Sequence, residues 1–155
     1  HNSYLKARVI FDSKEPLLKD KDFVVIAADT VVVLNNCLFE KPKDVYDAKR
    51  MLTQLSGKRH DVLSGLSLIY HTSEEQIYEK TICVISKVYM KKLSAEEIDK
   101  YVLSGEPLDK AGAYAVQGIG AYMIEKIEGS YTNVVGLPLC ELVKILIEEF
   151  QIKLI

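Results

Sequence analysis

The 155 residues suffice for one domain with a sizeable core, and a composition of 48% hydrophobic and 27% charged residues excludes wholesale disorder. The formal net charge of −2 gives no electrostatic case for binding a nucleic-acid polymer, and the apolar runs are too short to span a membrane. Three widely spaced cysteines without a CxxC pair are typical of reduced, buried thiols in a cytoplasmic protein and argue against a zinc site.

The first predicted element is the tail of an amphipathic helix over residues 2–11, in which Leu5 and Val9 stand four positions apart. Residues 14–22 form a charged connector, and the apolar run 23–28 predicts a strand buried on both faces. After a stop at Asp29 and Thr30, further elements predict one α/β domain over residues 1–155. They are a resumed strand at 31–34, a turn at 35–36, a short strand at 37–39, a helix capped by Asp44 and closed by Gly57, long strands at 60–70 and 76–90, a capping-box helix at 94–104, a strand at 122–127, a loop at 129–138 and an amphipathic helix from 139.

The glycine-rich run 105–121 is the segment that most strongly indicates a ligand. Its glycines permit positive φ and a close approach of the backbone to a bound molecule. Asp109, Lys110 and Gln117 add one charge of each sign and an amide, a set that suits a phosphate-bearing ligand, and we assign them to substrate binding. Alternatively, Asp109 and Lys110 form a local ion pair that shapes the loop, and Gln117 bonds to the backbone.

Asp29 interrupts an apolar strand, where a carboxylate without a partner would be costly. Its place at a strand end suits coordination of a divalent cation or orientation of a water, and equally suits the start of a tight turn. Lys41, before a proline, is placed either to reach a phosphate or to be a solvated charge, and Lys6 taken alone is an exposed helix lysine. His60 is expected near the surface. From the residues alone, we predict a phosphate-directed α/β protein without a defined reaction.

Several separate blocks resemble the Maf family of nucleotide pyrophosphatases, in the family's order and over nearly the whole chain. They are Ala27-Ala-Asp-Thr-Val-Val32, Glu40-Lys-Pro42, Met51-Leu-Thr-Gln-Leu-Ser-Gly57, Gly105-Glu-Pro-Leu-Asp-Lys-Ala-Gly-Ala-Tyr114, Gln117-Gly118 and Gly129-Ser-Tyr-Thr-Asn-Val-Val-Gly-Leu-Pro138. The resemblance implies a mixed, elongated sheet with flanking helices, related to inosine triphosphate pyrophosphatases, and a ligand cleft between two lobes. It also implies hydrolysis of a nucleoside triphosphate to the monophosphate and pyrophosphate, with Mg²⁺ or Mn²⁺ as cofactor.

The resemblance further implies roles for single residues. Asp29 matches the family's catalytic proton acceptor, which handles water or metal, and Lys6 and Lys41 match lysines that face the phosphates. Thr30 and Gln117 match positions linked to substrate choice. The Gln117-Gly118 block resembles that of the family branch that acts on dTTP and UTP, so pyrimidine triphosphates are the expected substrates. The resemblance also implies a house-cleaning role, the removal of non-standard nucleotides.

One departure from the family concerns the start of the chain. Family members begin with a strand and a Ser-x-x-Arg-Arg loop that grips the triphosphate, and nothing in this sequence matches that segment. We expect that the natural protein has it and this sequence lacks it, with a shortened paralogue as the alternative. Two rival functions stay open: a 7-methyl-GTP pyrophosphatase, and a non-catalytic nucleotide-binding regulator of cell division. The resemblance is compatible with a homodimer.

Overall fold

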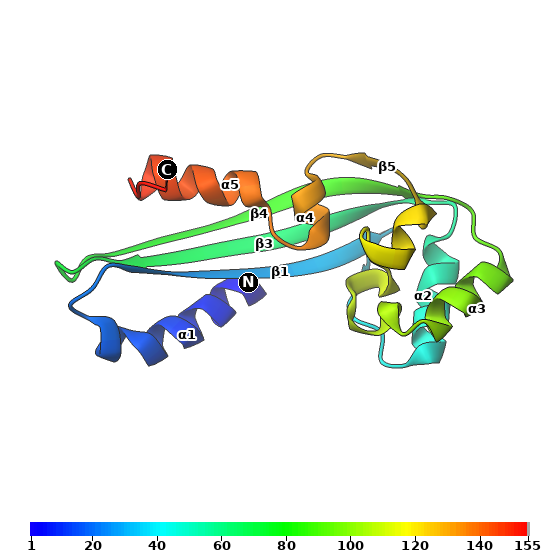
Figure 1. Cartoon of the computed structure of the whole chain (residues 1–155), viewed down its shortest axis with the longest axis horizontal. Helices are drawn as coiled ribbons and strands as arrows, with labels where there is room; N and C mark the ends of the chain where they lie inside the picture. The colour runs from blue at the N-terminus through cyan, green and yellow to red at the C-terminus, as the bar shows by residue number, and fades with distance from the viewer. Residues whose placement is uncertain (155) are drawn as a thin grey trace. The chain divides into compact units, whose positions relative to one another are not determined.

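The computed structural model describes residues 1–154 and places helices around a five-stranded sheet with the strand order β2-β1-β3-β4-β5 (Figure 1). The strands are β1 (Phe23–Leu34), β2 (Cys37–Phe39), β3 (Arg59–His71), β4 (Ile77–Met90) and β5 (Ile124–Glu128). The helices are α1 (Asn2–Leu18), α2 (Val45–Leu55), α3 (Ala95–Leu103), α4 (Tyr131–Val135) and α5 (Leu139–Lys144), which continues as a π-helical turn over Ile145–Glu149. β2 pairs antiparallel with β1, and β5 pairs antiparallel with β4. The predicted α/β class is confirmed.

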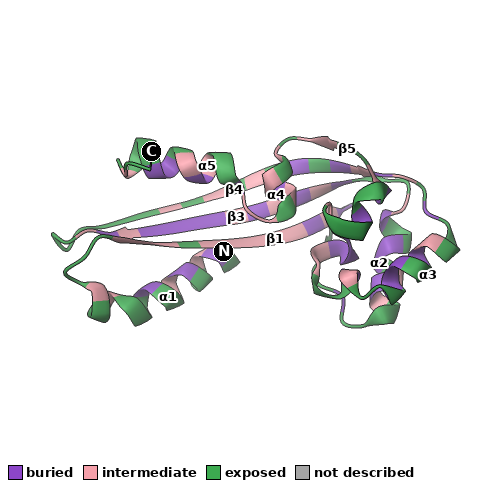
Figure 2. Ribbon diagram, viewed as in Figure 1, coloured by how far each residue is buried: buried purple, intermediate pink, exposed green. Residues whose placement is uncertain are grey.

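The chain forms two compact units that share strands β1, β3 and β4. The first comprises residues 1–29, 64–84 and 136–154, and the second comprises Thr30–Leu63 and Ile85–Val135. β1 passes from the first unit to the second at Asp29 and Thr30. β3 is the middle strand of the sheet and is buried along most of its length (Figure 2).

In the first unit, α1 and α5 lie on opposite sides of the shared strands (Figure 1). The buried side chains of α1 pack with Ile69, Phe23, Val25 and Ala27, whereas α5 and its continuation pack with Leu66 and Leu68. Because side chains alternate between the faces of a strand, odd-numbered positions from residue 23 onward face α1. Asp29 therefore points to the α1 side of the sheet.

Helix α1 buries a different face from the one predicted, and it is longer. Ser3, Ala7 and Phe11 are its buried residues, whereas Leu5 and Val9 are 47% and 69% exposed. The helix continues to Leu18, so the predicted connector at 14–22 is largely helical. Small residues at positions 3 and 7 let the helix backbone approach the sheet closely, which the apolar pattern alone does not reveal.

The predicted stop at Asp29 and Thr30 is wrong, because strand β1 runs without a break to Leu34. The first half of β1 is also mostly half-buried, whereas it was predicted to be buried on both faces. Two further expectations were wrong. His60 is buried, with 1% of its surface exposed. The three cysteines are free, as expected, but exposed. The predicted loop at 129–138 contains α4, and a 3-10 turn over Gly118–Met123 delays the start of β5 to Ile124.

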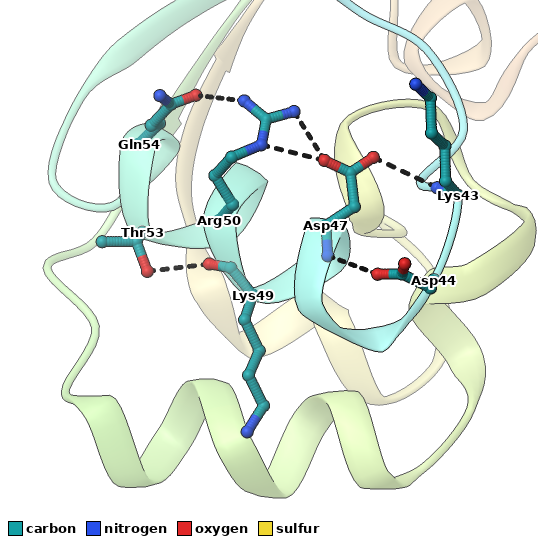
Figure 3. Close-up of polar contacts among 7 residues, drawn as sticks. All are labelled: Lys43, Asp44, Asp47, Lys49, Arg50, Thr53 and Gln54. Carbon is teal, nitrogen blue, oxygen red and sulfur yellow. Dashed lines mark hydrogen bonds and ion pairs between the residues drawn. The ribbon is translucent and has the colours of Figure 1, made fainter.

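In the second unit, local signals placed most elements correctly. Asn35 and Asn36 form the predicted turn with φ of 51° and 63°. The capping box at the start of α3 is present, with both reciprocal bonds between Ser94 and Glu97. Asp44 caps α2 by accepting a hydrogen bond from the Asp47 amide at 2.8 Å (Figure 3). α2 and α3 pack on a core formed with the end of β1, the beginning of β3 and the end of β4.

Candidate functional site

Asp29 is held by two side chains of helix α1. The Lys6 ammonium forms an ion pair with its Oδ1, and Asn2 Nδ2 donates to its Oδ2 at 3.2 Å. Asn2 and Lys6 stand four positions apart, so both project from the same side of the helix. The Asp29 side chain is 23% exposed and that of Lys6 is 58% exposed. We call these three residues the Asp29 cluster.

The cluster keeps Asp29 ionised. Partial burial raises the pKa of the carboxyl, but the hydrogen bonds from Lys6 and Asn2, together with the charge of Lys6, outweigh it and lower the pKa below its usual value. The two donors also explain why a strand can continue through an aspartate, since its carboxylate has partners. An ionised, partly solvent-facing carboxylate can orient a water or contribute to binding a cation.

In the second unit, Lys41 lies close to the predicted pair of Asp109 and Lys110. Lys110 Nζ donates to Asp109 Oδ1 at 2.6 Å, so the alternative of a local ion pair is confirmed. This hydrogen bond lowers the pKa of the Asp109 carboxyl, and the charge of Lys41 contributes in the same direction. The glycine-rich run is joined to this region by the Gly112 amide, which donates to the Glu40 carbonyl at 3.1 Å.

The segment that carries Lys41 lies between β2 and α2 and is held from the helix side. Asp47 accepts a hydrogen bond from the Lys43 amide at 3.1 Å and is itself bound by Arg50, through Nε at 2.9 Å and Nη2 at 2.6 Å (Figure 3). Arg50 also donates to the Gln54 side chain at 3.2 Å. These contacts fix the backbone two residues after Lys41, whose own side chain stays exposed.

Gln117 is exposed and extended, and it directly precedes the turn that begins at Gly118. That turn has an internal partner that the sequence analysis missed. The Glu106 carboxylate accepts the backbone N–H groups of Ile119 at 3.1 Å and Gly120 at 2.8 Å. Two of the amides that made the run resemble a phosphate cradle are therefore already bound to an anion of this chain.

Other residues of the site divide into those anticipated and those missed. Thr30 follows Asp29 in β1 and is half-buried. Asn2 was missed, although its spacing of four from Lys6 is a signal that could have found it. The family resemblance assigned Lys6 and Asp29 to one site, but their ion pair was not predicted, because no pattern in the sequence joins an α1 side chain to β1.

No three His, Cys, Asp or Glu side chains within residues 1–154 gather closely enough to hold a metal ion alone. Mg²⁺ in phosphate-processing sites commonly uses one or two carboxylates together with the substrate's phosphates. As a single carboxylate, Asp29 fits a cation of that kind.

No helix within residues 1–154 has the length and apolar character needed to cross a membrane.

The sequence model of the family described as "Maf-like protein" matches residues 1–149. This chain belongs to the Maf family. The Maf chain is 45% identical to the dTTP/UTP pyrophosphatase of Alkaliphilus metalliredigens over 136 residues, which are 88% of this chain and 69% of that protein. Its identity to the proteins of the same name from Citrifermentans bemidjiense and Vibrio parahaemolyticus is 51% and 49%, over 76% and 86% of this chain.

The Maf chain spans 60% of the length of the Citrifermentans protein and 67% of the length of the Vibrio protein. The family match covers all of the residues described above as candidate site residues. Family membership, predicted from the sequence blocks, is thus confirmed.

Proposed function

We propose that this protein hydrolyses nucleoside triphosphates, preferentially dTTP and UTP, to the nucleoside monophosphate and pyrophosphate. The observation that carries the proposal is the Asp29 cluster, in which an ionised carboxylate and a lysine meet in a chain similar to proteins named dTTP/UTP pyrophosphatase. In this reaction, the water oxygen bonds to the α-phosphorus while the bond from that phosphorus to the α–β bridging oxygen breaks. Pyrophosphate leaves, and the water gives up a proton.

Asp29 would orient the attacking water and accept its proton. With Lys6 bound, the lowered pKa makes Asp29 a weak base. The Lys6 side chain is 58% exposed, so it is free to turn toward a phosphate when the substrate binds. Losing the Lys6 partner would raise the pKa of Asp29 and make it a stronger base at the time it is needed. Lys6 would then neutralise phosphate charge in the transition state.

A divalent cation, Mg²⁺ or Mn²⁺, would bind with the triphosphate and neutralise the charge that develops on its oxygens. Asp29 is the residue we assign to it. We assign Lys41 to the phosphates, and Thr30, Gln117, Asp109 and Lys110 to recognition of the nucleotide. The Asp109–Lys110 pair would shape the glycine-rich run that also carries Gln117. A house-cleaning role, a cytoplasmic location, a homodimer and a single working domain stay predictions of the family resemblance.

The test is pyrophosphate release from a panel of dTTP, UTP, CTP, dGTP and 7-methyl-GTP, each with Mg²⁺ or Mn²⁺. Asp29→Asn should lower kcat by about 10²–10⁴-fold, the usual contribution of a positioned acid–base group. The matched control is Asp12→Asn, which removes an exposed carboxylate of α1 that pairs with Arg8 and should leave turnover unchanged.

Each outcome separates the rival functions. Turnover that prefers dTTP and UTP and is lost in Asp29→Asn supports the proposal. A preference for 7-methyl-GTP would favour the other pyrophosphatase branch and refute the argument from Gln117. Nucleotide binding by the wild-type protein without pyrophosphate release would indicate a regulator rather than an enzyme. Activity that survives in Asp29→Asn would show that the catalytic assignment is wrong.

A further inference from the structure

Gly65 lies on β3 at a point that both α1 and β1 approach. A Cβ atom added to Gly65 would lie 2.9 Å from Ser3 Oγ, 3.5 Å from Ser3 Cβ and 3.9 Å from the carbonyl oxygen of Asp29. Unlike Gly105, Gly65 does not have a positive φ. A Cβ here would therefore force Ser3 to shift, so glycine matters at this position for the space it leaves and not for its conformational freedom.

Ser3 is anchored at the same point by a chain of hydroxyl groups. Ser3 Oγ lies 2.8 Å from Ser67 Oγ, which lies 2.9 Å from Thr81 Oγ1. Ser3 and Ser67 are almost completely buried, so each hydroxyl needs its partner. The bonds fix how deeply the first turn of α1 sits on the sheet and how it is rotated.

The first turn of α1 is also the part that holds Asp29. Ser3 stands between Asn2 and Lys6, the two donors to the Asp29 carboxylate. We propose that Gly65 and Ser3 are positioning residues, whose close contact sets the height of α1 over β3 and so holds Lys6 and Asn2 on the Asp29 carboxylate. The effect on turnover rests on the proposed function, whereas the effect on Asp29 itself does not.

A second set of contacts also ties α1 to the sheet and serves as the control. Glu79 of β4 accepts from the Tyr4 hydroxyl at 3.1 Å and from Arg8 Nη1 at 2.8 Å. These groups are solvent-exposed or half-exposed, and exposed pairs contribute little to stability. Glu79→Gln should therefore leave both the Asp29 cluster and turnover unchanged.

The experiment compares Gly65→Ala, Ser3→Ala and the double variant with the wild-type protein. NMR titration of the Asp29 carboxyl and kcat/KM for dTTP are measured for each. Gly65→Ala should raise the pKa of Asp29 and lower kcat/KM, because the displaced Lys6 is no longer placed to neutralise phosphate charge. The loss should be at most about 100-fold, the value for a displacement of the order of 1 Å in a catalytic group. In the double variant, the close contact with the hydroxyl is gone, and the added methyl meets the Cβ at position 3 at 3.5 Å and the Asp29 carbonyl oxygen at 3.9 Å, both ordinary contacts. Both quantities should then return to their values in Ser3→Ala.

The results distinguish the inference from the proposed function. An unchanged pKa of Asp29 in a folded Gly65→Ala protein, or a double variant as impaired as Gly65→Ala, would overturn the positioning role. If Gly65→Ala does not fold, recovery of the fold in the double variant supports the inference, and failure to recover overturns it. A shifted pKa in a protein that hydrolyses no nucleotide would retain the inference and refute the proposed function.

Discussion

Acidification should destabilise this protein through His60. The imidazole is 1% exposed, its Nε2 lies 2.6 Å from the Tyr114 hydroxyl, and the two rings meet edge to face. Burial lowers the pKa of His60 from 6.5 to about 4, because the imidazolium would lose its hydration inside the fold. At 1.36 kcal/mol per pKa unit, the gap between 6.5 and about 4 is worth roughly 3 kcal/mol of folding free energy.

The sign follows from which state binds the proton first. Above pH 6.5, His60 is neutral in the folded and unfolded protein and contributes no pH dependence. As the pH falls from 6.5 toward 4, the unfolded chain takes up the proton while the folded protein does not, so the free energy of unfolding decreases. Below about pH 4 both states are protonated, and the loss attributable to His60 stops growing.

The assay is denaturant unfolding between pH 7 and pH 3, with Tyr114→Phe compared with His60→Phe/Tyr114→Phe. Both variants lack the hydroxyl, so neither leaves it buried without a partner, and they differ only in the titrating imidazole. Tyr114→Phe should lose about 3 kcal/mol more than the double variant on going from pH 7 to pH 4. Parallel stability curves for the two variants would refute the reasoning.

Two further predictions concern the glycine-rich run. Glu106→Gln should lower the free energy of unfolding by about 1–3 kcal/mol and speed hydrogen exchange at the two amides that it binds, because they lose a charged acceptor, whereas Glu96→Gln on the surface of α3 should change neither. Gly112→Ala should destabilise more than Gly105→Ala in the same unfolding assay. Both residues have positive φ, which strains alanine by about 1–2 kcal/mol, but only at Gly112 would a Cβ meet Val32, at 3.0 Å. Equal losses in the two alanine variants would show that the contact has no effect.

Elements that depend on neighbours in the sequence were predictable. The cap of α2, the capping box of α3 and the turn at Asn35 and Asn36 each use atoms within a few residues of one another. The hairpin of β3 and β4 was located to within one residue for the same reason, since a polar turn separates two strand-like runs. The α/β class follows from the order of these elements.

The candidate site was only partly predictable. Asp29 stands out in the sequence because a carboxylate in an apolar strand needs partners, and the period of two along β1 assigns it a face. Its partners Lys6 and Asn2 lie on a helix 23 and 27 residues away, and nothing local indicates that they meet it. Glu106 was passed over for a similar reason, because its bonds to amides 13 and 14 residues later require the turn at Gly118.

By itself, the sequence determined the kinds and order of the elements, the family and the residue types available for chemistry. Only the tertiary structure decided that Ser3, Ala7 and Phe11, rather than Leu5 and Val9, form the buried face of α1, and that His60 lies in the core. The physical reason is that local patterns record what each segment can bury, whereas the choice of partner depends on shape. At Gly65 the missing side chain admits Ser3, and that contact brings Lys6 to Asp29.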